Sequence, residues 1–180
     1  MKCYITRFKT LFSFSFLYVV NGVNMIRKKN LNTKEERLFL AAKAIKESII
    51  RNLPIEDGGY NCPILVEGIN DVKCLRVLGF LGIIETVNKG WDRPRMVAYL
   101  HETYGAKLAI DGLPRIILLM DWDRTGEVLQ KSFTNRLNSM DVKVDDSLRN
   151  SLSRQFKYEC KTVESIISFS DTLLEIIPQI

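Results

Sequence analysis

The chain has 180 residues, which is enough for one domain with a buried core, and nothing in it suggests two domains. Its formal net charge is +5, but Lys2, Arg7 and Lys9 lie in an initial segment without acids, which leaves +2 for residues 25–180 and weak support for nucleic-acid binding. No Cys-x-x-Cys pair occurs among the four cysteines, and His101 is the single histidine, so we expect reduced thiols rather than a zinc site.

Residues 1–24 differ in composition from the rest and form a leader of doubtful status. The apolar stretch 11–20 follows basic residues and is too short for a membrane-spanning helix, which needs about 20 residues. It has the length of a secretory signal, with Gly22 as a small residue for cleavage. The alternatives are a mis-called start, with translation beginning at Met25, and a genuine extra segment. In each case we expect residues 25–180 to form the single domain, without stable membrane association.

The predicted elements alternate between helix and strand along the chain. Residues 33–36 have the pattern of a capping box, and apolar residues at helical spacing then continue as far as Leu53, which predicts an amphipathic helix. Further elements follow with short loops between them: strand 62–66, helix 70–78, strand 82–87, helix 95–104, a loop 105–114 with room for a short edge strand, strand 116–120, helix 127–138, strand 142–144, and helices 146–156 and 162–177.

This order predicts an α/β fold with a parallel sheet flanked by helices, because consecutive strands joined by helices pair in parallel through right-handed crossovers. About four strands suffice, and the core of the domain covers about residues 62–146. The first helix and the carboxyl-terminal helices add packing layers outside this core.

The most informative stretch is 116–126. Five apolar residues without alternation indicate a strand buried on both faces, and an acid pair and a glycine close it. Because side chains alternate along an extended chain, Asp121 and Asp123 can project to the same side. Gly126 permits a close turn before the next helix, whose amino-terminal N–H groups would point toward a bound anion.

A second strand also ends in an acid. Residues 62–66 lead into Glu67, then a glycine and a helix that starts near Asp71. In a parallel sheet the strand ends face one way, so Glu67, Asp121 and Asp123 are expected to place three carboxylates within reach of one cation. Oxygen ligands favour Mg²⁺, with Mn²⁺ as an alternative. Asp71 is either a helix cap or a further member of the site.

These two motifs, Glu67-Gly68-x-x-Asp71 and Asp121-x-Asp123-x-x-Gly126, together resemble the Toprim domain of topoisomerases, primases, old-family nucleases and ribonuclease M5-like proteins. The order and approximate spacing of both halves match. More narrowly, residues 33–166 resemble the small archaeal Toprim proteins related to ribonuclease M5. The resemblance implies a Rossmann-like Toprim fold.

The resemblance also implies a function. In Toprim domains the acids that match Asp121 and Asp123 bind the metal, and the glutamate that matches Glu67 is either a further ligand or the general acid/base. This predicts a Mg²⁺-dependent phosphodiester-processing enzyme that acts on nucleic acid in the cytoplasm. Cleavage of structured RNA is favoured over DNA and over primer synthesis, since a nuclease needs little more than water, a metal and a proton carrier.

Basic residues near the expected site are candidates for phosphate binding. Lys89 and Arg124 are the foremost of these because their sequence neighbours form the site. Arg149 belongs to a possible basic strip on a later helix, for which a solvated helix face is the preferred interpretation. Trp122 is expected to pack against the sheet rather than to stack on a base. The remaining residues of these two groups are Arg93, Arg95 and Lys131 near the site, and Arg154, Lys157 and Lys161 in the strip.

Two other functions stay open. Asp121-x-Asp123-x-Thr125 also fits the first motif of haloacid dehalogenase-type phosphatases, although that family needs further motifs downstream and would leave Glu67 without a role. The second alternative is a Toprim module that binds metal or nucleic acid without catalysis.

Overall fold

A computed structural model describes residues 33–105 and 108–180 of the chain. Residues 34–180 form one compact unit. The predictions for the leader, residues 1–24, lie outside the described residues. Within the described ranges, none of the helices combines the length and the apolar character that crossing a membrane would require.

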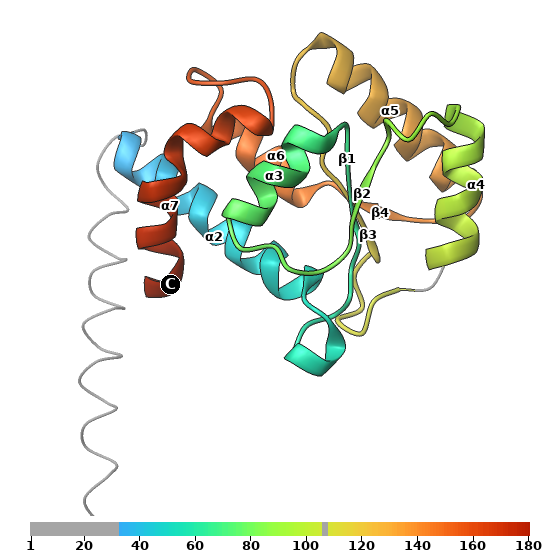
Figure 1. The fold of residues 1–180 in the computed structure, drawn as a ribbon, viewed down its shortest axis with the longest axis horizontal. Helices are drawn as coiled ribbons and strands as arrows, with labels where there is room; N and C mark the ends of the chain where they lie inside the picture. Colours follow the sequence, from blue (N-terminus) through green and yellow to red (C-terminus); the bar gives the residue numbers. More distant parts are fainter. Residues whose placement is uncertain (1–32, 106–107) are drawn as a thin grey trace, which may run out of the picture. The chain divides into compact units, whose positions relative to one another are not determined.

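The centre of the fold is a sheet of four parallel strands in the order β2-β1-β3-β4 (Figure 1). This confirms the predicted α/β fold with a parallel sheet. Every residue of the two central strands is buried, as the unbroken apolar runs in the sequence indicated. In register, Ile64 of β1 lies between Ile84 of β2 and Ile117 of β3. The strands are β1 (Ile64–Val66), β2 (Ile84–Thr86), β3 (Ile116–Leu118) and β4 (Val144–Asp145).

Helices cover both faces of the sheet, and side-chain alternation along the strands divides the core into two clusters (Figure 1). Ile64 and Ile117 face one cluster, while Leu65 and Leu118 face the other. The first cluster is completed by α2 (Lys34–Asn52), α3 (Ile69–Val77), α6 (Ser147–Gln155), the 3-10 helix η3 (Glu164–Phe169) and α7 (Ser170–Ile176), and the second by α4 (Arg93–Tyr104) and α5 (Arg124–Asn138). Two further 3-10 turns are η2 (Ile55–Asp57) and η4 (Ile177–Gln179).

Some predicted boundaries are wrong. The segment 162–177 is not one helix, since η3 precedes α7. Its hydroxyls bond locally, Thr162 with Ser165 at 2.6 Å and Ser168 with the Ser165 carbonyl at 2.8 Å, and such bonds compete with regular helix formation. Helix α5 begins at Arg124, earlier than predicted, because an aspartate caps it. The described part of the 105–114 loop holds no strand.

Asn52, at the end of α2, joins this helix to two strands. Its side chain is fully buried, and its Nδ2 donates to the carbonyls of Cys62 at 3.0 Å and Ile83 at 2.9 Å. Its Oδ1 accepts from the Gly82 N–H at 2.8 Å. A β-carbon at Gly82 would lie 1.8 Å from the Asn52 carbonyl oxygen, so the chain must carry glycine there. One amide therefore bonds three backbone groups, of which the Ile83 carbonyl also accepts from the Ile64 N–H at 3.0 Å, while the Cys62 carbonyl and the Gly82 N–H have no second backbone partner among the described residues.

We expect Asn52→Ala to lower the free energy of unfolding by about 2 to 4 kcal/mol, because it leaves buried backbone groups without partners. Urea denaturation followed by circular dichroism measures this change. Asn135→Ala is the matched control, since Asn135 is exposed on α5 and its side chain should contribute little. Equal stability of the two variants would contradict the role assigned to Asn52.

Candidate functional site

The carboxyl ends of β1 and β3 bring two of the predicted acids together. The strands pair in parallel, and the ladder continues past β3, where the Leu119 N–H donates to the Leu65 carbonyl at 2.9 Å. The Asp121 N–H then donates to Glu67 Oε1 at 3.1 Å, although 54 residues separate the two positions. Glu67 and Asp121 thus lie side by side on one edge of the sheet.

The Asp121 carboxylate is in an environment that disfavours its charge. Burial, and to a lesser degree the negative charges of Asp71, Glu67 and Asp123, raise the pKa of Asp121 to about 7, although a hydrogen bond from the Val163 N–H to Oδ1 at 2.7 Å acts in the opposite direction. The pKa of Glu67 is also raised, chiefly by burial. Near neutral pH this cluster therefore holds protons or attracts a cation.

Asp123 has a structural role as well as a place in the cluster. Its Oδ1 accepts from the Gly126 N–H at 2.7 Å and caps α5. A β-carbon at Gly126 would lie only 2.2 Å from the Asp121 carbonyl oxygen, so the helix can pack against the end of β3 only with glycine at this position. The spacing Asp121-x-Asp123-x-x-Gly126 is thus explained by a capped helix start that approaches the strand closely.

Asp71 is part of the first turn of α3. It is 5 % exposed, and its Oδ2 accepts from the Gly68 N–H at 2.9 Å, which supports the predicted helix-cap role. Burial raises the pKa of Asp71. Its charge in turn contributes to the raised pKa values of Asp121 and Glu67, so Asp71 acts on the site through its charge.

That Glu67, Asp121 and Asp123 bind a metal ion stays a prediction. Among the described residues, no group of three or more His, Cys, Asp and Glu side chains is arranged to hold a metal ion. Backbone N–H groups hold one oxygen each of Glu67, Asp121 and Asp123. The second oxygen of each carboxylate accepts no hydrogen bond from the described part of the chain, and carboxylate oxygens are ligands that suit Mg²⁺.

Arg149 of α6 binds the backbone at the end of β3, next to the acids. It is buried, so its predicted place on a solvated helix face is wrong. It is 6 % exposed, its Nε donates to the Met120 carbonyl at 3.0 Å, and its Nη2 donates to the Asp121 carbonyl at 2.8 Å. Its Nη2 also pairs with Glu127 at 2.8 Å. The sequence did hold a signal, since Arg149 precedes Leu152 by three residues and so shares the core-facing side of α6.

A carboxyl-terminal segment, 160–163, lies against the acids and was missed by sequence reasoning. The Trp122 N–H donates to the Lys161 carbonyl at 3.0 Å, and the indole Nε1 donates to the Cys160 carbonyl at 2.7 Å. Trp122 is partly buried and packs against the first core cluster, which confirms its predicted packing role. These bonds hold the segment so that the Val163 N–H reaches Asp121.

The two basic residues singled out as substrate contacts differ in their surroundings. Lys89 forms an ion pair with Glu85 of β2. Arg124 is exposed at the first position of α5 and forms no ion pair with the described residues. Arg124 is therefore the more available of the two for an anion at the helix start.

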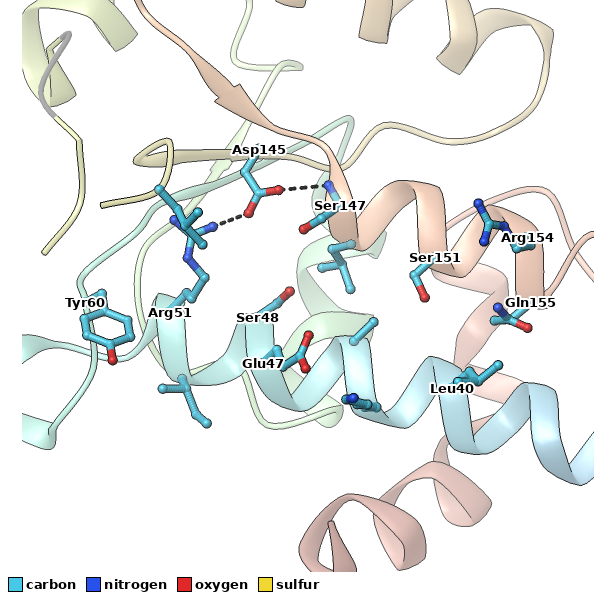
Figure 2. A pocket seen from close by; sticks show the side chains of 15 residues that line it. Leu40, Glu47, Ser48, Arg51, Tyr60, Asp145, Ser147, Ser151, Arg154 and Gln155 are labelled. Atoms are coloured by element: carbon cyan, nitrogen blue, oxygen red, sulfur yellow. Dashed lines mark hydrogen bonds and ion pairs between the residues drawn. The ribbon is translucent and has the colours of Figure 1, made fainter. Parts of the chain in front are cut away.

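A groove of about 620 Å³ between α2 and α6 is separate from the acid cluster (Figure 2). Neither Glu67 nor Asp121 lines it. The side chain of Arg51 lies at one end, where it pairs with Asp145, and it also pairs with Asp111 at 2.7 Å. These contacts tie the end of α2 to the sheet, so the charges of Arg51, Asp111 and Asp145 have a structural explanation.

Asp121 should make stability depend on pH. Its pKa is about 7 in the folded chain against an ordinary value of 3.8, so between about pH 4 and 7 the folded chain keeps a proton that the unfolded chain has lost. The free energy of unfolding in chelator should therefore fall as pH rises through this window. Asp121→Asn should reduce the slope, whereas Asp141→Asn, at an exposed position, should leave it unchanged. Parallel slopes for wild type and Asp121→Asn in urea titrations would refute the assignment.

Arg149→Met should lower the free energy of unfolding by about 2 to 4 kcal/mol, because it removes the donors for two carbonyls and leaves them unpaired. Glu127→Gln weakens the ion pairs of the more exposed Glu127 with Arg149 and Lys131 but leaves the carbonyl contacts of Arg149 in place, and it should lower the free energy of unfolding by about 1 kcal/mol or less. Thermal and urea denaturation compare the two variants. A larger loss in Glu127→Gln would show that the ion pair, and not the carbonyl contacts, is the main contribution of Arg149.

Comparison with known proteins places the chain in a family. No protein-family model matches it. A UPF0292 protein of Thermoplasma volcanium is 32 % identical over 104 residues, which are 58 % of this chain and 78 % of that protein. UPF0292 proteins of Methanosarcina barkeri and Methanocaldococcus jannaschii are 29 % and 28 % identical over 121 residues, which are 66 % and 67 % of this chain and 76 % and 86 % of those proteins.

Among solved structures, a protein from Aquifex aeolicus aligns with 70 % of this chain and 94 % of its own, at 25 % sequence identity and a TM-score of 0.49. The identity with the Thermoplasma volcanium protein, over most of that protein's length, shows that this chain belongs to the UPF0292 family.

Proposed function

We propose that this protein is a Mg²⁺-dependent phosphodiester-processing enzyme of the Toprim kind, a ribonuclease M5-like nuclease that cleaves structured RNA in the cytoplasm. The observation that carries the proposal is the meeting of Glu67 and Asp121 at the adjoining carboxyl ends of β1 and β3, with Asp123 two residues farther at the start of α5. Acids gathered at this edge of a parallel sheet are placed where substrates of α/β proteins bind.

The electrostatics of the cluster favour a cation. Burial and mutual repulsion raise the pKa of both Asp121 and Glu67, so the cluster carries its full negative charge only at a cost. Asp121 and Asp123 would hold Mg²⁺ through their unbonded oxygens, with Mn²⁺ as a substitute. The bound cation would supply positive charge to stabilise the transferring phosphoryl group.

Glu67 is the residue best suited to move a proton. Its Oε1 is held by the Asp121 N–H, which leaves Oε2 to carry the proton, and its raised pKa brings proton transfer closer to neutral pH. Helix α5 starts beside the acids with Arg124 exposed in its first turn, and its N–H groups favour an anion such as the phosphate of a nucleic-acid strand.

Two alternatives have specific observations for or against them. A module that binds metal or nucleic acid without catalysis would need fewer positioned groups than a nuclease, and among the described residues no group of three or more His, Cys, Asp and Glu side chains is arranged to hold a metal ion. A haloacid dehalogenase-like phosphatase is less well supported, because its first motif gives no role to Glu67, which contacts Asp121 directly. We therefore prefer the nuclease and keep the binding module as the second candidate.

The test is incubation of the purified protein with labelled structured RNA, single-stranded DNA and duplex DNA, each with Mg²⁺, Mn²⁺ or chelator. We expect metal-dependent cleavage of the RNA. Asp121→Asn should lose both Mg²⁺ binding, measured by calorimetry, and cleavage. Glu67→Gln should lower turnover by about 100-fold or more while Mg²⁺ affinity changes little, as expected for loss of a general acid/base. Asp141→Asn serves as the charge-matched control and should behave as wild type.

Other outcomes would change the assignment. Loss of Mg²⁺ binding in Glu67→Gln would make Glu67 a ligand. Binding of Mg²⁺ without cleavage of any substrate would replace the nuclease by the binding module. Metal-dependent release of phosphate from a monoester, with no cleavage of nucleic acid, would favour the phosphatase.

A further inference from the structure

We propose that Trp91 and Arg95 form a stacking platform that binds a base of single-stranded nucleic acid beside the carboxylate site. The platform lies at the start of α4, in the segment that follows β2. The inference rests on the proposed function in one respect, because it places the base next to a site that would process the same strand.

The two side chains form a preassembled surface. The Arg95 guanidinium carbon lies 4.8 Å from the centroid of the Trp91 ring, a cation–π stack. Trp91 is further held by Tyr99 in an edge contact, with ring centroids 5.3 Å apart and planes at 72°. A planar guanidinium on an indole presents a flat, positively charged face, and such faces stack on nucleic-acid bases.

A buried carboxylate anchors this surface. Glu85 of β2 is 6 % exposed and accepts hydrogen bonds from Tyr99 at 2.8 Å and Tyr104 at 2.7 Å. Glu85 also forms an ion pair with Lys89, and the Lys89 ammonium lies 5.5 Å from the centroid of the Tyr99 ring. Both tyrosines belong to α4, so Glu85 fixes the helix that carries Arg95 against the edge strand. The platform is thus built on secondary structure and not on a loop alone.

The platform lies close to the acids. The Asn88 N–H donates to the Glu67 carbonyl at 3.1 Å, so the segment after β2 is bonded to the site itself. Trp91 is three residues farther, which limits its Cα to within about 11 Å of that of Asn88. The loop between β2 and α4 also leaves the sheet at the edge where α5 begins (Figure 1). A strand with its phosphate at the acids can therefore place a neighbouring base on the platform.

The charge of the segment fits a polyanion. Arg93 and Arg95 are exposed and form no ion pair with the described residues. The nearby acid, Asp92, uses its Oδ1 to accept the Arg95 N–H at 2.9 Å as the cap of α4. Two unpaired guanidinium groups beside an aromatic ring match the combination of phosphates and bases in a single strand.

The test is binding of a fluorescein-labelled single-stranded RNA of about 12 nucleotides, within the range that single-strand sites cover, to the full chain in chelator. Fluorescence anisotropy should show that Trp91→Ala and Arg95→Ala each weaken binding by about 5- to 100-fold, as expected for loss of a stacked base. Arg136→Ala is the charge-matched control, because Arg136 is exposed and lies about 18 Å along the axis of α5 from Arg124 at the helix start. This variant should weaken binding less than about twofold.

Two further measurements keep the result unambiguous. RNA should quench the tryptophan fluorescence of wild type but not of Trp91→Phe, in which Trp122 is the remaining tryptophan, and circular dichroism should show that all variants are folded. Affinities of Trp91→Ala and Arg95→Ala equal to that of Arg136→Ala would overturn the proposal, as would equally tight binding of duplex RNA that does not depend on Trp91. Trp91-dependent binding of the single strand, together with a failure to cleave structured RNA in Mg²⁺, would instead leave the platform in place and refute the nuclease.

Discussion

The structure depends on the contacts that converge on Asp121. Its N–H donates to Glu67, its carbonyl accepts from Arg149, and its carboxylate accepts from the Val163 N–H. Gly126 lets α5 pack directly against its carbonyl. Segments from four parts of the chain thus fix one carboxylate in a half-buried position. Since burial of a carboxylate disfavours its charge, this arrangement favours a proton or a cation on Asp121 near neutral pH.

The acids of this edge combine structural and functional roles. Asp123 caps α5 and Asp71 closes the first turn of α3, so each of these acids contributes to the stability of a helix start as well as to the charge of the site. Their charges nevertheless contribute to the raised pKa of Asp121. The site is therefore coupled to the two helix starts, and the platform of Trp91 and Arg95 adds a third helix start at the same edge.

The sequence predicted the alternation of strands and helices and the meeting of Glu67 with Asp121, because parallel strands place their carboxyl ends on one edge. It could not predict Val163 as a partner of Asp121, since that contact depends on how a carboxyl-terminal segment packs after the sheet has formed. Arg149 was assigned to a solvated helix face because arginine is usually exposed, although its position on α6 faces the core. The segment 162–177 was predicted as one helix from the spacing of its apolar residues. That spacing carries no information on the local hydrogen bonds of Thr162, Ser165 and Ser168, which compete with a regular helix.

The central claim, that a half-buried Asp121 binds a divalent cation, is tested most directly by an NMR titration of its side-chain carboxyl carbon. In chelator the carboxyl should titrate with a pKa near 7. Saturating Mg²⁺ should move that pKa downward, because a bound cation favours the ionised form. An Asp121 carboxyl that titrates at the ordinary value for aspartate and does not respond to Mg²⁺ would contradict the account.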